Sequence, residues 1–198
     1  MYEAIVVGVS AGGLHALSQF LPCLPPHYPL AVIVVQHRHR DSDDFLVNHL
    51  NNLSAVEVKE AEPGELIQPG YAYIAPAGYH LLVERDKTLS LSIDLPVNYS
   101  IPSIDVLFQS AATCYKNHLI GLILTGANSD GSLGLQTIKQ FGGYAIVQDP
   151  QTAEVDVMLK AAIDLVEVDN ILSIVDLGNF FAQCQFESQS VGDKEGEA

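Results

Sequence analysis

The chain has 198 residues, of which 48% are hydrophobic and 17% charged, so it is long enough for one domain with a full hydrophobic core. Its 24 acidic and 9 basic residues give a formal net charge of −15. This balance disfavours nucleic acid and anionic membrane surfaces as partners, because both attract positively charged proteins. The sequence contains neither a run of about 18 apolar residues nor the basic start of a secretory signal, so we expect no membrane insertion.

The cysteines Cys23, Cys114 and Cys184 lie far apart, and no CxxC pair occurs. This pattern predicts neither a disulfide framework nor a thiolate metal site, and it favours a reducing, cytoplasmic location. Metal-ligand spacings such as HExxH are also missing from the sequence. We therefore expect no metal and no cofactor.

Short apolar runs rich in β-branched residues alternate with stretches of helical periodicity. The predicted strands are residues 4–9, 30–35, 119–124, 144–147 and 165–168. The predicted helices lie around residues 14–21, 45–50, 103–111 and 133–141. Because the strands are apolar almost throughout, the alternation predicts an α/β fold with a parallel sheet covered on both faces.

Residues 56–93 break this alternation, because strand-like segments follow one another there without helices. Turn pairs such as Pro63-Gly64 and Asp86-Lys87 separate them, and the last two segments alternate like a hairpin with one wet face. We interpret the segment as an antiparallel insertion or sheet extension. One domain is expected over residues 1–186, followed by an acidic, disordered tail at 187–198.

Polar loops follow three of the predicted strands, at the sheet edge where open α/β folds bind ligands. The first, residues 8–13, reads GVSAGG and contains GxSxG, which is compatible with Ser10 as a nucleophile on a sharp strand-to-helix turn. The Ala11 N–H and the helix N-terminus would then stabilise an oxyanion. The alternatives are a phosphate-binding glycine loop or a plain tight turn.

The other two loops could complete the same chemistry. His37 directly follows the second strand and is well placed as a general base, although a surface histidine in a basic loop is an alternative. Asp130 lies in the glycine-flanked loop 125–131 and could orient a histidine or cap the helix that follows. The joint occurrence of serine, histidine and aspartate at strand ends is more specific than any one of them.

Six stretches of the sequence, in the same order, resemble the catalytic domain of the chemotaxis receptor methylesterases of the CheB type. They are residues 8–13, 34–37, 59–76, 96–108, 121–134 and 147–154. The resemblance implies a doubly wound, mostly parallel sheet of Rossmann-like topology with an antiparallel hairpin. It also implies hydrolysis of glutamyl γ-methyl esters on receptor helices, with glutamine deamidation in some members.

By this resemblance Ser10 is the nucleophile, His37 the base and acid, and Asp130 its orienting partner. Residues expected to hold the oxyanion or line the site are Ala11, Gly12, Gly126 and Ala127. The candidates for substrate contact are Arg38, Arg40, His15 and Tyr99. The expected substrate is a methylated chemoreceptor or a similar helical protein.

The chain also departs from the family pattern. Ala11 replaces a common threonine, GANSDG at 126–131 replaces GMGxDG, and Val157-Met158-Leu159 stands where the family has GMP. The sequence starts at the first esterase strand, so regulation by a separate receiver protein in trans is expected. The alternatives are a regulatory or binding module with weakened catalysis and an esterase of a signalling system unrelated to chemotaxis.

Overall fold

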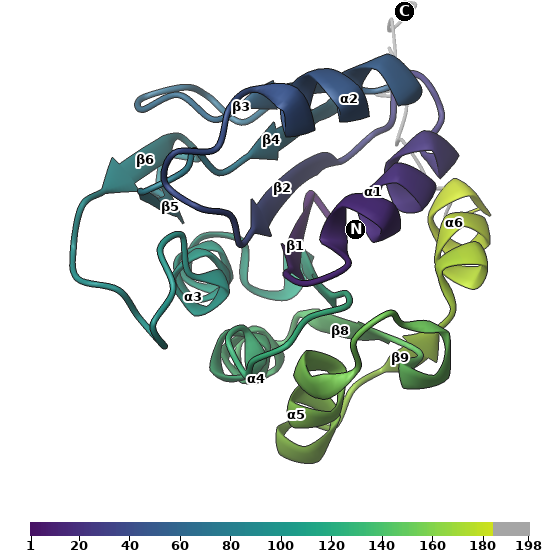
Figure 1. Cartoon of the computed structure of the whole chain (residues 1–198). Coiled ribbons are helices and arrows are strands. Elements are labelled where there is room, and N and C mark those ends of the chain that lie inside the picture. Colours follow the sequence, from purple (N-terminus) through teal and green to yellow (C-terminus); the bar gives the residue numbers. More distant parts are fainter. Residues whose placement is uncertain (184–198) are drawn as a thin grey trace, which may run out of the picture.

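A parallel sheet forms the centre of the protein. The computed structural model describes residues 1–183, and within them seven strands pair in the order β3-β4-β2-β1-β7-β8-β9 (Figure 1). The strands are β1 (Ala4–Val9), β2 (Ala31–Gln36), β3 (Glu57–Glu60), β4 (Tyr71–Ile74), β7 (Leu119–Ile123), β8 (Tyr144–Gln148) and β9 (Asn170–Leu172). Every neighbouring pair in this sheet is parallel, which confirms the predicted α/β class.

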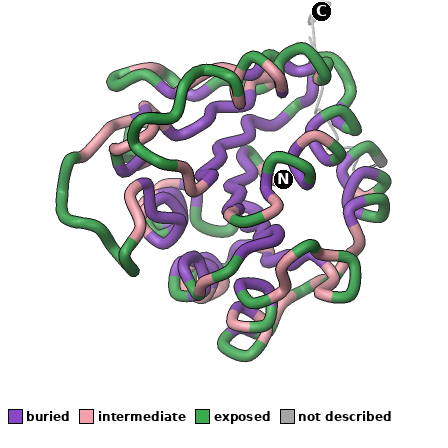
Figure 2. The backbone as a smooth tube through the Cα atoms, viewed as in Figure 1, coloured by how far each residue is buried: buried purple, intermediate pink, exposed green. Residues whose placement is uncertain are grey.

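Helices cover both faces of the sheet (Figure 1). The helices on one face are α1 (Gly13–Phe20), α2 (Phe45–Leu53) and α6 (Ile174–Gln183), and those on the other are α3 (Ile104–Tyr115), α4 (Ser132–Gln140) and α5 (Val157–Leu165). Three single 3₁₀ turns, η1 (Leu21–Cys23), η2 (Lys116–His118) and η3 (Pro150–Thr152), complete the helical segments described. Figure 2 shows the buried strands between exposed outer helix faces.

Successive residues of β1 supply two separate cores, because side chains alternate across a strand. Ile5 and Val7 pack with α1 and α6, whereas Ala4 and Val6 pack with α3. All four side chains have no exposed surface. The apolar run of the first strand is therefore explained by burial on both faces.

The segment from residue 56 to 93 differs in part from the prediction. Only β5 (His80–Val83) and β6 (Leu89–Ser92) form an antiparallel hairpin, in a sheet of their own. The strands β3 and β4 instead join the main sheet in parallel. The connection at 61–70 returns the chain so that β4 runs parallel to β3. Val58 of β3 is buried on the face of the sheet covered by α2.

The strand predicted at 165–168 is wrong. Helix α5 extends to Leu165, and its core residues Leu159, Ala162 and Val166 repeat at near-helical spacing, which accounts for the apolar run. The true last strand, β9, lies at the edge of the sheet and has no fully buried residue. The predicted tail at 187–198 lies outside the described residues.

Within residues 1–183, no helix combines the length and apolar character needed to cross a bilayer. 

Gly8 allows α3 to approach the centre of the sheet. A Cβ atom at Gly8 would lie 2.3 Å from Ile104 Cγ2, at the first residue of α3.

Replacing Gly8 by Ala should therefore lower the free energy of unfolding by about 2–3 kcal/mol, the usual cost of overpacking a core. Chemical denaturation measures this. The control Gly64→Ala meets no atom within 4 Å and has only its φ of 80° to oppose it, so a cost of about 1 kcal/mol is expected; equal losses would contradict the packing argument.

Candidate active site

Three adjacent strands, β2, β1 and β7, bring the three predicted side chains together at one edge of the sheet. Ser10 follows β1 directly, His37 follows β2 directly, and Asp130 lies in the loop between β7 and α4. Parallel strands end at the same edge, so residues 27 and 93 positions apart in the chain become neighbours. The topology, not local sequence, creates the cluster.

The His37 ring bridges the other two side chains. Its Nδ1 lies 3.2 Å from Ser10 Oγ, and its Nε2 lies 2.8 Å from Asp130 Oδ2. A carboxylate can only accept, so the tautomer that satisfies both contacts carries its proton on Nε2. Nδ1 is then the free base that faces the serine hydroxyl. His37 is partly buried, with 14% of its side chain exposed.

Asp130 is fully buried and caps α3 rather than the helix that follows it in sequence. Its Oδ2 accepts the Ile104 N–H at 2.7 Å, and its Oδ1 accepts the Asp105 N–H at 3.2 Å and the Ser103 hydroxyl at 2.9 Å. These groups form the N-terminus of α3, where orphan N–H donors and the helix dipole favour an anion. Of the two roles considered for Asp130, capping its own helix is therefore wrong, because Gly131 occupies that position.

The charge of Asp130 is stabilised by this environment. Burial alone would raise the pKa of Asp130, but the hydrogen bonds from His37, Ile104, Asn98 and Ser103 together outweigh it and hold the pKa below its ordinary value. The carboxylate therefore stays ionised at neutral pH although water does not reach it. An ionised Asp130 is what fixes the orientation and tautomer of His37.

The Ser10 turn is held in place by both neighbouring strands. Its N–H donates to the Thr125 carbonyl at 2.9 Å. The Gln36 side-chain amide donates to the Ser10 and His37 carbonyls at 3.0 and 2.9 Å, which ties the serine loop to the histidine loop. The Thr125 hydroxyl donates to the Ala11 carbonyl at 2.9 Å. The nucleophile candidate thus lies on a fixed turn.

The residues expected to donate to an oxyanion differ in whether their backbone N–H groups are already hydrogen-bonded. Among the backbone hydrogen bonds of residues 1–183, none uses the Ala11 N–H, and Ala11 is exposed beside Ser10. Gly12 is the N-cap of α1, and Ala127 is exposed. Gly126 cannot serve as a donor as expected, because its N–H is bound to the Val155 carbonyl at 3.0 Å.

Gly126 nevertheless lines the site. A Cβ atom there would lie 3.0 Å from Ser10 Cβ and 2.5 Å from Met158 Cε. The loop therefore passes between these two side chains only because residue 126 is glycine. Met158 is completely buried, so the segment 157–159, which departs from the family pattern, still packs against the serine turn.

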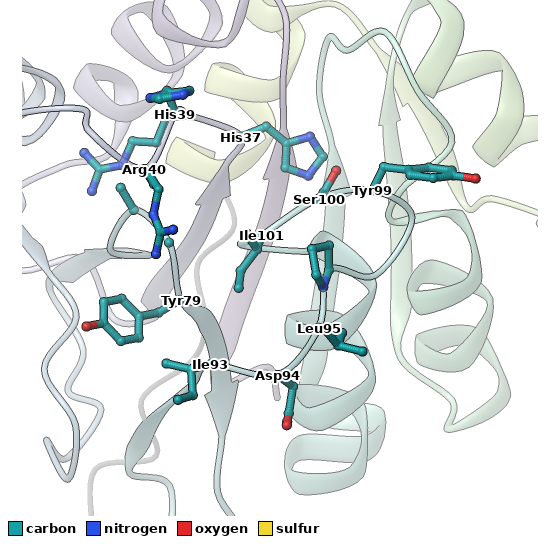
Figure 3. Close-up of a pocket in the computed structure, with 14 residues that line it drawn as sticks. His37, His39, Arg40, Tyr79, Ile93, Asp94, Leu95, Tyr99, Ser100 and Ile101 are labelled. Atoms are coloured by element: carbon teal, nitrogen blue, oxygen red, sulfur yellow. The ribbon is translucent and has the colours of Figure 1, made fainter.

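A cavity of about 890 Å³ opens beside His37 (Figure 3). Arg40 and Tyr79 lie on one side of it, and residues 93–96 and 99–101 form the other side. Within the described chain, the Arg40 guanidinium has no ion-pair partner, so it places a positive charge in this cavity, which the acidic Asp94 also lines. Tyr99 also lines the cavity and is fully exposed.

Two of the predicted contact residues are placed differently. The Arg38 guanidinium binds Glu60 and the Ala75 carbonyl, and its side chain is 7% exposed, so its charge is already neutralised. His15 is hydrogen-bonded to Gln19 at 2.6 Å and lines a separate cavity of about 180 Å³ on the other side of the serine turn. Arg38 still lines the same cavity as Arg40, whereas His15 does not.

Sequence reasoning missed the residues that hold Asp130 from α3 and from the segment before it. Asn98, Ser103 and Ile104 all donate to this carboxylate. Ser103 occupies the N-cap position of α3, but its side chain makes no capping bond to the helix and donates to Asp130 instead. The only signal in the sequence was that Asn98 and Ser103 fall within one of the six stretches that resemble the family.

No group of three or more histidine, cysteine, aspartate or glutamate side chains within residues 1–183 is arranged to hold a metal ion. The side chains that meet at this edge are a hydroxyl, an imidazole and a buried carboxylate, each in contact with the next. This arrangement is the one that serine hydrolases use on several unrelated folds. The fold is α/β, and the site brings together the side chains from which such a hydrolytic centre is built.

Comparison with known proteins identifies the family. The family model described as CheB methylesterase matches residues 5–181. The crystal structure of the Thermotoga maritima CheB methylesterase catalytic domain superposes with a TM-score of 0.88 at 33% identity, covering 92% of this chain and 98% of that one. The chain belongs to the CheB methylesterase family.

The names of curated relatives agree with this family assignment. A protein of Leptospira interrogans, provisionally named protein-glutamate methylesterase/protein-glutamine glutaminase, is 50% identical over 180 residues, which cover 91% of this chain and 93% of that protein. A protein of Halalkalibacterium halodurans with the same two activities in its name is 42% identical over 170 residues. That match covers 84% of this chain and 49% of the relative, so the chain spans about half of the longer protein.

Replacing Asp130 by Asn should reveal the stabilisation that its charge provides. Because the pKa of Asp130 is lower folded than its ordinary value of 3.8, the ionised form stabilises the fold above that value, and the contribution is lost as pH falls through the folded pKa. At pH 7 we expect the variant to be less stable by about 3 kcal/mol. The gap should narrow below about pH 4.

Urea denaturation across this pH range measures the gap. Asp164→Asn, which changes an exposed carboxylate on α5, is the control and should cost little at any pH. A difference between wild type and Asp130→Asn that stays constant down to about pH 2 would show that the charge of Asp130 does not stabilise the fold.

Proposed function

We propose that this protein hydrolyses glutamyl γ-methyl esters on a methylated chemoreceptor or a similar helical protein, with Ser10, His37 and Asp130 as catalytic residues. Membership of the CheB methylesterase family supports the reaction. The observation that carries the residue roles is the His37 ring, which contacts Ser10 Oγ through one nitrogen and Asp130 through the other.

In the first half of the reaction, Ser10 Oγ attacks the ester carbonyl carbon while its proton passes to His37 Nδ1. Asp130 stabilises the imidazolium that forms. The Ala11 N–H is the best placed donor to the oxyanion, because it lies next to the nucleophile and is not used in the backbone network. Collapse of the tetrahedral intermediate breaks the C–O bond, and methanol leaves with the proton from Nδ1.

In the second half, water attacks the acyl-enzyme and gives a proton to His37 Nδ1. The Ser10–acyl bond then breaks, the proton returns to Ser10 Oγ, and the glutamate carboxylate is released. The same steps on a glutamine side chain release ammonia in place of methanol. Deamidation is therefore part of the proposal, and the second activity in the names of the relatives supports it.

Two further parts of the proposal concern the cellular location of the enzyme and its regulation. We place the enzyme in the cytoplasm, in agreement with the free thiols of Cys23 and Cys114. We also propose a separate receiver protein that regulates it in trans. The support for this partner is the resemblance alone, since family members usually carry a receiver domain before the esterase.

Ser10→Ala should abolish methanol release from a methylated chemoreceptor. Loss of the nucleophile from such a triad typically costs about 10⁶-fold in rate. Release is measured with radiolabelled methyl groups, and mass spectrometry after treatment with a fluorophosphonate should show labelling of the wild type at Ser10. Wild-type protein that is neither labelled nor active would contradict the proposal and favour a regulatory module with weakened catalysis. Labelling without methanol release would favour another ester as substrate.

Arg40→Glu should weaken turnover of an acidic receptor substrate by roughly fivefold in kcat/KM, because Arg40 supplies the positive charge of the cavity. Turnover of a small neutral ester, p-nitrophenyl acetate, should change less. The matched control is Arg85→Glu, which changes the net charge equally at a position outside this cavity. Equal losses from the two variants, or equal losses on both substrates, would rule out a local role for Arg40.

A further inference from the structure

A strap, residues 93–101, connects β6 to α3 and forms one side of the cavity (Figure 3). Its residues 93–99 are exposed, with Ile93 and Leu95 more than four-fifths exposed. Such a segment has little packing of its own to hold it. Its position has to be fixed at a few defined contacts.

The strap turns back on itself at Asn98 and Tyr99. Val97 and Ser100 exchange two backbone hydrogen bonds, of 3.1 and 2.9 Å. The two central residues have φ values of 51° and 62°, the combination of positive angles found in type I′ hairpin turns. Asparagine tolerates this conformation, whereas tyrosine does so at a cost. The turn sends the Tyr99 side chain into solvent and the Asn98 amide toward the protein.

The Asn98 amide bridges two buried carboxylates. Nδ2 donates to Asp105 Oδ2 at 2.7 Å and to Asp130 Oδ1 at 3.1 Å. Asp105 is 2% exposed, and its other oxygen accepts the Gly134 N–H at 2.6 Å. Burial, with the charge of Asp130, raises the pKa of Asp105. The amide therefore sits where two anionic groups would otherwise repel each other.

We propose that Asn98 is a positioning residue for the hydrolytic site, which couples the strap to the carboxylate that orients His37. The inference rests on the proposed function. When the strap is seated, the amide is one of the donors that stabilise the ionised form and the position of Asp130. A substrate that displaces the strap from the cavity would withdraw this donor. The position of the strap and the basicity of His37 are therefore linked.

Few charged groups face Asp130, so a substitution at Asn98 should have a measurable effect on the reactivity of Ser10. His37 contacts it from the end of β2, and Asp105 approaches from α3. His80 of β5 accepts the N–H of Ser103, whose hydroxyl donates to Asp130, and its Nε2 donates to the strap carbonyl of Leu95. Asp94, the acidic residue in the first half of the strap, is exposed and accepts a hydrogen bond from the Ser92 hydroxyl.

The first test compares two glycine substitutions in the same turn. Asn98→Gly keeps a residue that accepts positive φ but removes the amide, whereas Tyr99→Gly also places glycine in the turn and keeps the amide. The rate at which a fluorophosphonate labels Ser10 is measured for both at pH 7, together with thermal unfolding. We expect labelling of Asn98→Gly to be roughly tenfold slower than that of Tyr99→Gly, as for loss of a hydrogen bond to a charged group.

The second test uses Asn98→Asp, which replaces the donor by a third carboxylate. Added negative charge favours protonated imidazole, so the pH at which labelling reaches half its maximum should rise by about one unit. Tyr99→Asp adds the same charge on the solvent side of the turn and should shift this midpoint much less. A merely structural role would lower the rate without moving the midpoint.

The outcomes separate the two proposals. Wild-type protein that is not labelled at Ser10 would overturn the proposed function and this inference with it. Labelled wild type, with the two glycine variants equal in rate and an unshifted midpoint for Asn98→Asp, would overturn the inference alone.

Discussion

The rest of the site depends on one buried anion. Asp130 has no exposed surface, yet it remains ionised because the first N–H groups of α3 and the His37 ring donate to it. The N-terminus of α3 supplies these donors from its backbone, which also fixes their directions. The carboxylate in turn fixes the imidazole. A structural feature of the fold, the start of α3, is thereby also an electrostatic part of the site.

The central sheet determines which residues can meet this anion. Because β2, β1 and β7 are adjacent and parallel, their ends deliver histidine, serine and aspartate in that spatial order. Gly8 lets α3 approach closely enough to reach the loop after β7. The imidazole faces the serine through Nδ1 and the carboxylate through Nε2, the reverse of the order in chymotrypsin. In this orientation Nδ1 is the basic nitrogen at the serine hydroxyl.

Much of this arrangement could be predicted from the sequence. The buried strands are apolar almost throughout, and polar residues directly after them fall at the carboxyl edge of the sheet, so the positions of Ser10 and His37 were predictable. Residues 165–168 misled because the end of an amphipathic helix and a short buried strand look alike. The donors around Asp130 were not predictable, because N–H groups of α3 and the Asn98 amide reach it only through tertiary packing. The pairing of Arg38 with Glu60, which neutralises an expected contact residue, was hidden for the same reason.

The most direct measurement of the central claim is the protonation state of the His37 ring in solution. Nitrogen-15 NMR distinguishes a protonated from an unprotonated ring nitrogen, and comparison with His37→Gln assigns the signals among the seven histidines. We predict that, at a pH where the ring is neutral, the proton lies on Nε2, held by Asp130, and that Nδ1 is free to accept from Ser10. A ring that carries its proton on Nδ1 would contradict the account, because Ser10 would then have no base.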